Sequence, residues 1–229
     1  MTVLLALDTS SAWGSVAVDV DGTVRGTTLL EDRKEHAARL LPGIHEALAA
    51  AGLTTRDVSE IVVGEGPGSF TGVRVAAATA KGLAFALGVP LRPVSSLAAA
   101  ALTAPLSAPD EPTVRYVLFD ARGDRVYGAC YRTGASVFEE LVSPHGGRIQ
   151  DVLAGEVPVG SEFAGDGAVK HEAMLRKAGF GVVAEAAAPQ YALGLLRCVA
   201  LGGAPPPVDS SGWEPAYVRA SSAERVWGG

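Results

Sequence analysis

Apolar runs, alternating positions and turn signals divide the beginning of the chain into short strands. Residues 3–7 are a continuous apolar run, residues 14–20 alternate between apolar and polar positions, and residues 24–30 form a third candidate strand. Asp21 and Gly22 supply the backbone freedom that a two-residue hairpin turn requires. The pattern predicts a three-stranded antiparallel meander.

Helical periodicity follows the meander. Residues 35–52 place apolar side chains along one face of a helix, and Pro42 inside it should produce a kink. A strand at 60–63, a long helix at 70–87 and a strand at 91–94 come next. Three meander strands followed by alternating helices and strands are the βββαβαβ order of a ribonuclease-H-like domain.

The second half of the chain begins like the first. An apolar run at 117–120 ends in Asp120, as the first run ends in Asp8, and residues 126–131 have the pattern of a returning strand. We interpret this as a degenerate internal duplication, with two unrelated hairpins as the alternative. Further helices are predicted at 149–153, 169–178 and 190–201.

Proline-rich segments at 103–112 and 202–207 mark candidate domain boundaries. The sequence therefore predicts an α/β fold with two ribonuclease-H-like domains, at 1–104 and 105–207. The remaining tail, 208–229, has weak signals of its own and can return to the first domain.

The composition is typical of a globular cytoplasmic protein. Of the 229 residues, 48% are hydrophobic and 19% are charged, and the net charge of −6 argues against a protein that holds nucleic acid by itself. Cys130 and Cys198 lie far apart in apolar surroundings, which favours buried thiols in a reducing compartment. The N-terminus has no secretory pattern, and no uncharged apolar run approaches the ~20 residues of a membrane span. We expect no membrane contact.

A glycine-rich loop joins the strand at 60–63 to the helix at 70–87. Its candidate residues are Gly64, Gly66, Gly68, Ser69 and Gly72. A loop at a helix N-terminus can bind phosphate, but this one lacks the lysine of a Walker motif and the later acid of a dinucleotide fingerprint. Glu65 adds a negative charge and Pro67 removes a donor. A tight turn with Ser69 as the helix N-cap is the alternative that we favour over a nucleotide site.

Catalytic groups are not evident elsewhere. Asp8, at the end of the first strand, lies where this fold class often places a metal or phosphate ligand, although a buried or turn-forming aspartate has the same pattern. Asp120 and Asp124 flank Gly123 as in an ordinary hairpin. The four histidines lack the spacing of a metal site, and no nucleophile-elbow motif is present. We predict no catalytic residue, no metal site and no cofactor.

The helix at 70–87 carries only two charges, Arg74 and Lys81, and is otherwise apolar or small around its whole circumference. A helix that is apolar on all sides is buried on all sides. We therefore predict a subunit interface formed with the helix at 35–52, although burial by the rest of the chain would explain the same pattern. The predicted interface residues are Leu41, Ile44, Leu48, Val73, Ala76, Ala77, Ala80, Leu83, Ala84 and Leu87. A charge at Ala80 is expected to abolish pairing and to leave the fold intact.

A set of motifs that run in order along nearly the whole chain resembles one bacterial family. The motifs are Leu5-Ala-Leu-Asp-Thr-Ser10, Gly64-Glu-Gly-Pro-Gly-Ser-Phe-Thr-Gly-Val-Arg74, Ala80-Lys-Gly-Leu-Ala84, Val94-Ser-Ser-Leu97, Asp120-Ala-Arg-Gly-Asp-Arg-Val-Tyr127 and Glu214-Pro-Ala-Tyr-Val-Arg219, together with Glu35-His36. They resemble the TsaB (YeaZ) family, which is similar to TsaD (Gcp) proteins and shares their duplicated actin-like ATPase (ASKHA) fold.

The resemblance implies a role in making threonylcarbamoyladenosine on tRNA. It implies a non-catalytic subunit that pairs with a TsaD homologue through helices of the first domain, that is joined by the ATPase TsaE, and that also self-associates as a homodimer. Contact with tRNA would come only through the complex. Whether a nucleotide lies between subunits is left open. Family members often have Arg where this chain has Glu65, so Glu65→Ala is expected to change little.

Two other function classes compete with this one. An actin-like ATPase or kinase would bind nucleotide at Asp8 and the glycine loop. A Gcp-like metallopeptidase would hold a metal, but the pair of metal-binding histidines that marks TsaD is missing from this sequence.

Overall fold

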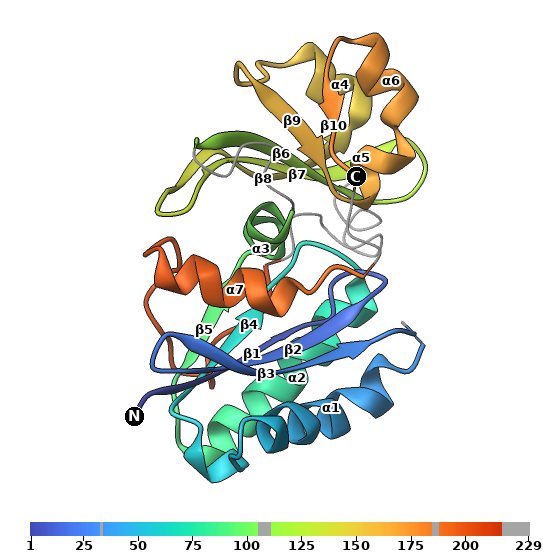
Figure 1. Ribbon diagram of the computed structural model, residues 1–229. Helices are drawn as coiled ribbons and strands as arrows, with labels where there is room; N and C mark the ends of the chain where they lie inside the picture. Colours follow the sequence, from blue (N-terminus) through green and yellow to red (C-terminus); the bar gives the residue numbers. More distant parts are fainter. Residues whose placement is uncertain (33, 105–110, 185–187, 217–229) are drawn as a thin grey trace.

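The structure, a computed structural model, describes residues 1–32, 34–104, 111–184 and 188–216. It contains two five-stranded mixed sheets, stacked with helices between them and on their outer sides (Figure 1). The first half of the chain forms β1 (Val3–Asp8), β2 (Gly14–Val20), β3 (Thr23–Leu30), α1 (His36–Ala50), the 3₁₀ turn η1 (Thr55–Asp57), β4 (Glu60–Gly64), α2 (Phe70–Leu87), β5 (Leu91–Val94) and α3 (Ser96–Thr103).

The second half repeats this order with shorter outer helices. It forms β6 (Thr113–Asp120), β7 (Arg125–Thr133), β8 (Phe138–Arg148), α4 (Ile149–Ala154), β9 (Ser161–Ala164), α5 (Asp166–Lys170), α6 (Glu172–Lys177), β10 (Gly181–Val182) and α7 (Tyr191–Ala200). The first sheet has the order β3-β2-β1-β4-β5 and the second has β8-β7-β6-β9-β10. The two sheets have the same topology, as the internal duplication predicts.

Local sequence signals explain the elements of the first half. Asp21 (φ 50°) and Gly22 (φ 83°) both adopt the left-handed conformation in the β2–β3 hairpin. Ser69 caps α2 by accepting a hydrogen bond from the Gly72 N–H at 3.3 Å, and Gly88 (φ 67°) ends the helix in the left-handed conformation. The predicted strands and the bounds of α2 are therefore confirmed.

Some elements are missed by the sequence patterns. No helix is predicted at 96–103 and no strand in the stretches that form β8, β9 and β10. The helix predicted at 169–178 is two short helices, α5 and α6, which meet at His171. The segment predicted as a linker at 103–112 lies partly outside the described residues.

Helices cover both faces of each sheet. α1 and α2 lie on the outer side of the first sheet, and α4, α5 and α6 lie on the outer side of the second (Figure 1). α3 and α7 lie between the sheets, where α7 packs on β1, β2 and β4, and α3 packs on β6 and β7. Each sheet is therefore covered on its inner face by a helix from the other half of the chain.

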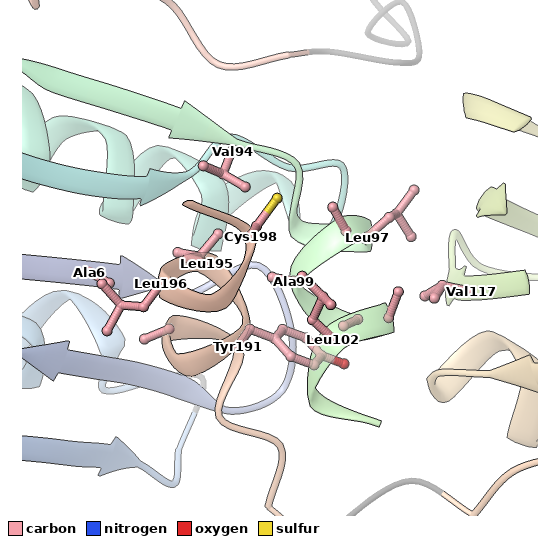
Figure 2. Close-up of a cluster of buried hydrophobic side chains, with 14 of the residues drawn as sticks. Ala6, Val94, Leu97, Ala99, Leu102, Val117, Tyr191, Leu195, Leu196 and Cys198 are labelled. Atoms are coloured by element: carbon pink, nitrogen blue, oxygen red, sulfur yellow. The ribbon is translucent and has the colours of Figure 1, made fainter. Parts of the chain in front are cut away.

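The two inner helices build one core that both halves share. Ala6 of the first sheet and Val117 of the second belong to the same buried cluster as Ala99 of α3 (Figure 2). A Cβ at Gly194 of α7 would overlap the backbone of α3 at Ala99, so the helices cross in backbone contact. Each half also has a buried cluster of its own, so the shared core joins the two halves across the boundary predicted near residue 104.

The chain after α7 returns to the first sheet. Val208 and Leu91 exchange backbone hydrogen bonds of 2.7 and 3.2 Å, which pairs the tail with the outer edge of β5. The backbone N–H of Ala216 donates to the carbonyl of Glu65 at 3.1 Å. We call residues 208–216 the strap. It lies along the first sheet and ends at the glycine loop.

Candidate functional site

The end of β1 and the glycine loop after β4 meet at the carboxyl edge of the first sheet. Asp8 is fully buried there. Its Oδ1 accepts hydrogen bonds from the N–H and the hydroxyl of Ser10 at 2.8 and 2.7 Å, and its Oδ2 accepts one from the Ser96 hydroxyl at 2.6 Å. Burial raises the pKa of Asp8, against the opposing effect of these hydrogen bonds and of the His36 charge. We call Asp8, Ser10 and Ser96 the aspartate corner.

Glycines in the loop are required by close backbone approach. A Cβ at Gly64 would overlap the Asp8 carboxylate, and one at Gly68 would overlap the Ser10 carbonyl. A Cβ at Gly72 would overlap the carbonyl of Thr9, which lies between Asp8 and Ser10 in the chain. The glycine loop is therefore packed directly against the aspartate corner.

Three of the loop N–H groups that could bind a phosphate are used within the chain. The N–H of Glu65 donates to Val94 at 3.0 Å, that of Gly66 to the Ser96 hydroxyl at 3.2 Å, and that of Ser69 to the Ser10 carbonyl at 2.7 Å. The geometry fits the tight turn with a Ser69 cap rather than an anion cradle.

Ser96 is the residue of this corner that sequence reasoning missed. It is the first residue of α3, and Ser95 caps that helix by accepting the Ala98 N–H at 3.4 Å. A pair of serines before an alanine-rich run is an N-cap signal, and it could have located both the helix and its contact with the first strand.

In the second sheet, the turn between β6 and β7 corresponds to the turn after β1, and both acidic and basic side chains stabilise it. Asp120 accepts hydrogen bonds from the Lys170 ammonium at 2.6 Å and from the Arg122 N–H at 2.8 Å. Burial raises the pKa of Asp120, but these two bonds and the Lys170 charge outweigh it and lower the pKa. Asp124 lies 3.6 Å from Arg148. Within the described ranges, no three His, Cys, Asp or Glu side chains are grouped so that they could hold a metal ion.

Most of the predicted interface residues lie on the buried sides of their helices. Seven of them are buried in the core of the chain itself: Ile44, Leu48, Val73, Ala76, Ala77, Ala80 and Ala84. Leu83 and Leu87 are half-buried, and Leu41 is exposed. α2 has no polar stripe, so its periodicity could not tell the sheet-facing side from the outer side. Ala80 is fully buried within the chain, so a charge there is now expected to destabilise the fold, contrary to the expectation from the sequence.

The outer sides of α1 and α2 nevertheless carry large exposed apolar side chains, beside charged residues such as Arg74, whose guanidinium lies over the Phe70 ring. Phe85 is 85% exposed, Phe70 is 51% exposed and Leu41 is 48% exposed. Ala78 and Gly82 lie on the same exposed side of α2 as Phe85, one helical turn apart. We call Leu41, Phe70, Ala78, Gly82 and Phe85 the outer face. Small residues beside a large aromatic one allow a second helix to approach closely.

α2 is also the one described helix that is long and apolar enough to cross a membrane. Six of its residues, Gly72 and Ala76 among them, are buried, and the helix packs on β4. Core helices of soluble proteins pass the same test of length and composition.

Fold and site together define a class: a duplicated ribonuclease-H-like protein with a closed aspartate corner and an apolar outer face. A family model described as TsaD, tRNA N6-adenosine threonylcarbamoyltransferase, matches residues 29–198. The tRNA threonylcarbamoyladenosine biosynthesis protein TsaB of Bacillus subtilis is 30% identical over 98% of this chain and 97% of its own length. TsaB of Escherichia coli is 36% identical over 67% of this chain and 63% of its own length.

Solved structures agree with these relatives. The structure titled YeaZ from Pseudomonas aeruginosa has a TM-score of 0.75 and 31% identity, and the match covers 95% of this chain and all (100%) of that one. A second Pseudomonas aeruginosa structure, described as similar to the peptidase YeaZ, has a TM-score of 0.77 at 31% identity, with 96% and 100% covered. The chain belongs to the TsaB (YeaZ) family.

Proposed function

We propose that this chain is a non-catalytic subunit of the assembly that makes threonylcarbamoyladenosine in tRNA, and that it pairs with a TsaD homologue through the outer face. The names of its relatives support the pathway, since TsaB of Bacillus subtilis is named a tRNA threonylcarbamoyladenosine biosynthesis protein. The match of the TsaD model to residues 29–198 supports a partner of related fold.

The exposure of Phe85 carries the pairing proposal. A phenylalanine that is 85% exposed, at the end of an apolar helix, gains about 1.5–3 kcal/mol when it is fully buried. Leu41 on the neighbouring α1 is also exposed, and Arg39 and Glu46 of that helix form an exposed ion pair with 3.8 Å between Nη2 and Oε1. An apolar centre with charges beside it has the composition of a protein–protein interface.

The aspartate corner supports a subunit without a reaction of its own. Asp8 is satisfied by Ser10 and Ser96, and three loop N–H groups are used within the chain. A kinase or ATPase would need these groups for its phosphate. Catalysis would then belong to the TsaD homologue, with the TsaE ATPase as a further member of the assembly, and tRNA would be held by the partners. In the absence of its partner the outer face would pair with a second copy of this chain.

The test compares Phe85→Glu with Val159→Glu. Val159 is 97% exposed in the second half of the chain, so its substitution is the matched control. Both variants should keep the wild-type melting temperature. Phe85→Glu should weaken binding to the TsaD homologue, measured by calorimetry, at least about tenfold, because a carboxylate would lose its hydration in the interface. Reconstituted tRNA modification should fall in parallel.

Equal affinities for both variants would show that the outer face is not the pairing surface. Full modification of tRNA by a mixture that lacks this chain would refute the subunit role. Modification or nucleotide hydrolysis by this chain alone would contradict its non-catalytic character.

A further inference from the structure

The strap is attached to the first half of the chain at a few defined points. At its start, Val208 pairs with the edge of β5 at Leu91. At its end, Ala216 bonds to the glycine loop. Between them, the Lys81 ammonium of α2 donates a hydrogen bond to the Trp213 carbonyl at 2.7 Å. The strap therefore connects three elements: the sheet edge, α2 and the glycine loop.

Trp213 is the central anchor of the strap. Its side chain packs against the buried cluster under α1 and α2, and it forms a hydrogen bond with the Glu65 carboxyl. Burial raises the pKa of Glu65, and the bond from Trp213 opposes this shift. Glu65 is thus a half-buried residue whose carboxyl accepts a hydrogen bond from the Trp213 indole of the strap.

The strap forms one border of the outer face. α1 lies over β2 and β3, whereas the strap lies along β5, so the two lie on opposite flanks of α2. Lys81 precedes Phe85 by one helical turn, which makes their side chains neighbours on the surface of α2. The carbonyl of Trp213 holds the Lys81 ammonium at this border.

We propose that the strap is a latch for pairing, in which Glu65 positions Trp213, and Trp213 holds the Lys81 ammonium away from the apolar outer face. This inference rests on the pairing role proposed above. A freed Lys81 ammonium would lose hydration when the outer face is covered, and that cost weakens pairing. Glu65 acts through Trp213 and Lys81, so it is a positioning residue for the partner.

The sequence alone predicted little effect of Glu65→Ala, and the contact with Trp213 leads to the opposite expectation. Glu65→Ala removes the acceptor of the indole N–H. Glu65→Gln keeps a carbonyl oxygen that accepts the same bond, so it should retain the latch. Glu139→Ala, at an exposed glutamate of β8, is the matched control.

The position of the strap is measured by fluorescence. The chain has three tryptophans, so replacing Trp13 and Trp227 by phenylalanine leaves Trp213 as the reporter. In this background, Glu65→Ala should shift the emission to longer wavelength and increase quenching by acrylamide. Glu65→Gln and Glu139→Ala should leave both unchanged. An unshifted spectrum in Glu65→Ala overturns the latch.

Affinity for the TsaD homologue is measured on the same variants. Glu65→Ala should weaken binding on the order of tenfold, and Glu65→Gln should bind as the wild type. Adding Lys81→Met to Glu65→Ala should restore most of the affinity, because no ammonium is left to desolvate. A displaced strap with unchanged affinity, or no rescue by Lys81→Met, overturns the coupling to pairing. A wild-type chain that fails to bind the homologue overturns the proposed function, and with it the role of the latch in pairing.

Discussion

Ala78 and Ala80 of α2 lie on opposite sides of the helix, so substitutions at these two positions distinguish the two sides. Ala80 is fully buried against the first sheet, and Ala78 is exposed on the outer face. A glutamate at either position adds the same side chain to the same helix. The difference between the two variants therefore measures which side the chain itself covers.

The expected losses in the free energy of unfolding differ widely between the two variants. Ala80→Glu places a carboxylate without a partner in the core and overfills it, which should cost at least about 4 kcal/mol of the free energy of unfolding. A domain of this size has about 5–15 kcal/mol in total, and each kcal/mol corresponds to about 2–4 °C in melting temperature. Ala80→Glu should therefore lose at least about 8 °C or fail to fold. Ala78→Glu should stay within about 2 °C of the wild type, since a surface change of this kind costs about 0.5 kcal/mol.

Circular dichroism gives the melting temperatures, and calorimetry gives the affinity for the TsaD homologue. Ala78→Glu should fold normally and bind at least roughly 30-fold more weakly, which corresponds to about 2 kcal/mol for a carboxylate desolvated in the interface. A stable Ala80→Glu variant that has lost pairing would refute the reasoning, because it would place the partner on the side assigned to the sheet. Normal pairing by Ala78→Glu would refute the choice of the outer face.

Further predictions concern the core and the aspartate corner. Because burial raises the pKa of Asp8, its proton is held more tightly in the folded chain, and the stability it contributes is present at low pH and lost as the pH rises through the folded pKa. Asp8→Asn cannot ionise, so its melting temperature should fall less than that of the wild type as the pH is raised from about 4; an equal fall would contradict this reasoning. Gly194→Ala should lower stability to urea by about 1–3 kcal/mol because the Cβ meets a helix backbone, whereas Gly82→Ala, with open space around it, should raise stability by about 0.5–1 kcal/mol. Neither Cys130 nor Cys198 should react with Ellman's reagent before the chain unfolds, since both are buried and burial raises the pKa of Cys198 to about 12; a thiol that reacts rapidly in the folded chain would show that its covering opens.

Local signals predict much of the first half of the fold, because the residues that begin or end these elements lie directly beside them in the sequence. The hairpin at Asp21 and Gly22, the cap at Ser69 and the stop at Gly88 each depend on residues next to the element they define. β8 is harder, because it contains Pro144, two adjacent glycines and irregular pairing with β7, so its pattern does not alternate regularly.

The shared core could not be predicted in this way. α3 and α7 lie almost a hundred residues apart in sequence, about 95 between Arg197 and the Leu102 carbonyl to which it donates a hydrogen bond. Each helix covers a sheet formed by the other half of the chain. Proline-rich segments mark where the chain changes direction, but they do not show against which sheet the next helix packs. The glycine loop could be predicted in part. Its turn and its Ser69 cap follow from the sequence, whereas its contact with Ser96 depends on the packing of α3.

The distribution of side-chain size on α2 is the strongest reason to expect a partner. In a helix that packs only on its own sheet, large apolar residues face the core and small or polar residues face water. α2 departs from this arrangement at its ends, where Phe70 and Phe85 face outward, while Ala76, Ala80 and Ala84 face inward. The alanines let the helix lie close to the sheet, so they are explained within the chain. Phe70 is half covered, with the Arg74 guanidinium carbon 3.9 Å from its ring centroid, but Phe85 leaves 85% of its surface exposed. An exposed aromatic side chain adds the risk of non-specific association. A second protein that covers Phe85 would account for its exposure, and we therefore place the proposed pairing surface on the side of α2 that the first sheet does not reach.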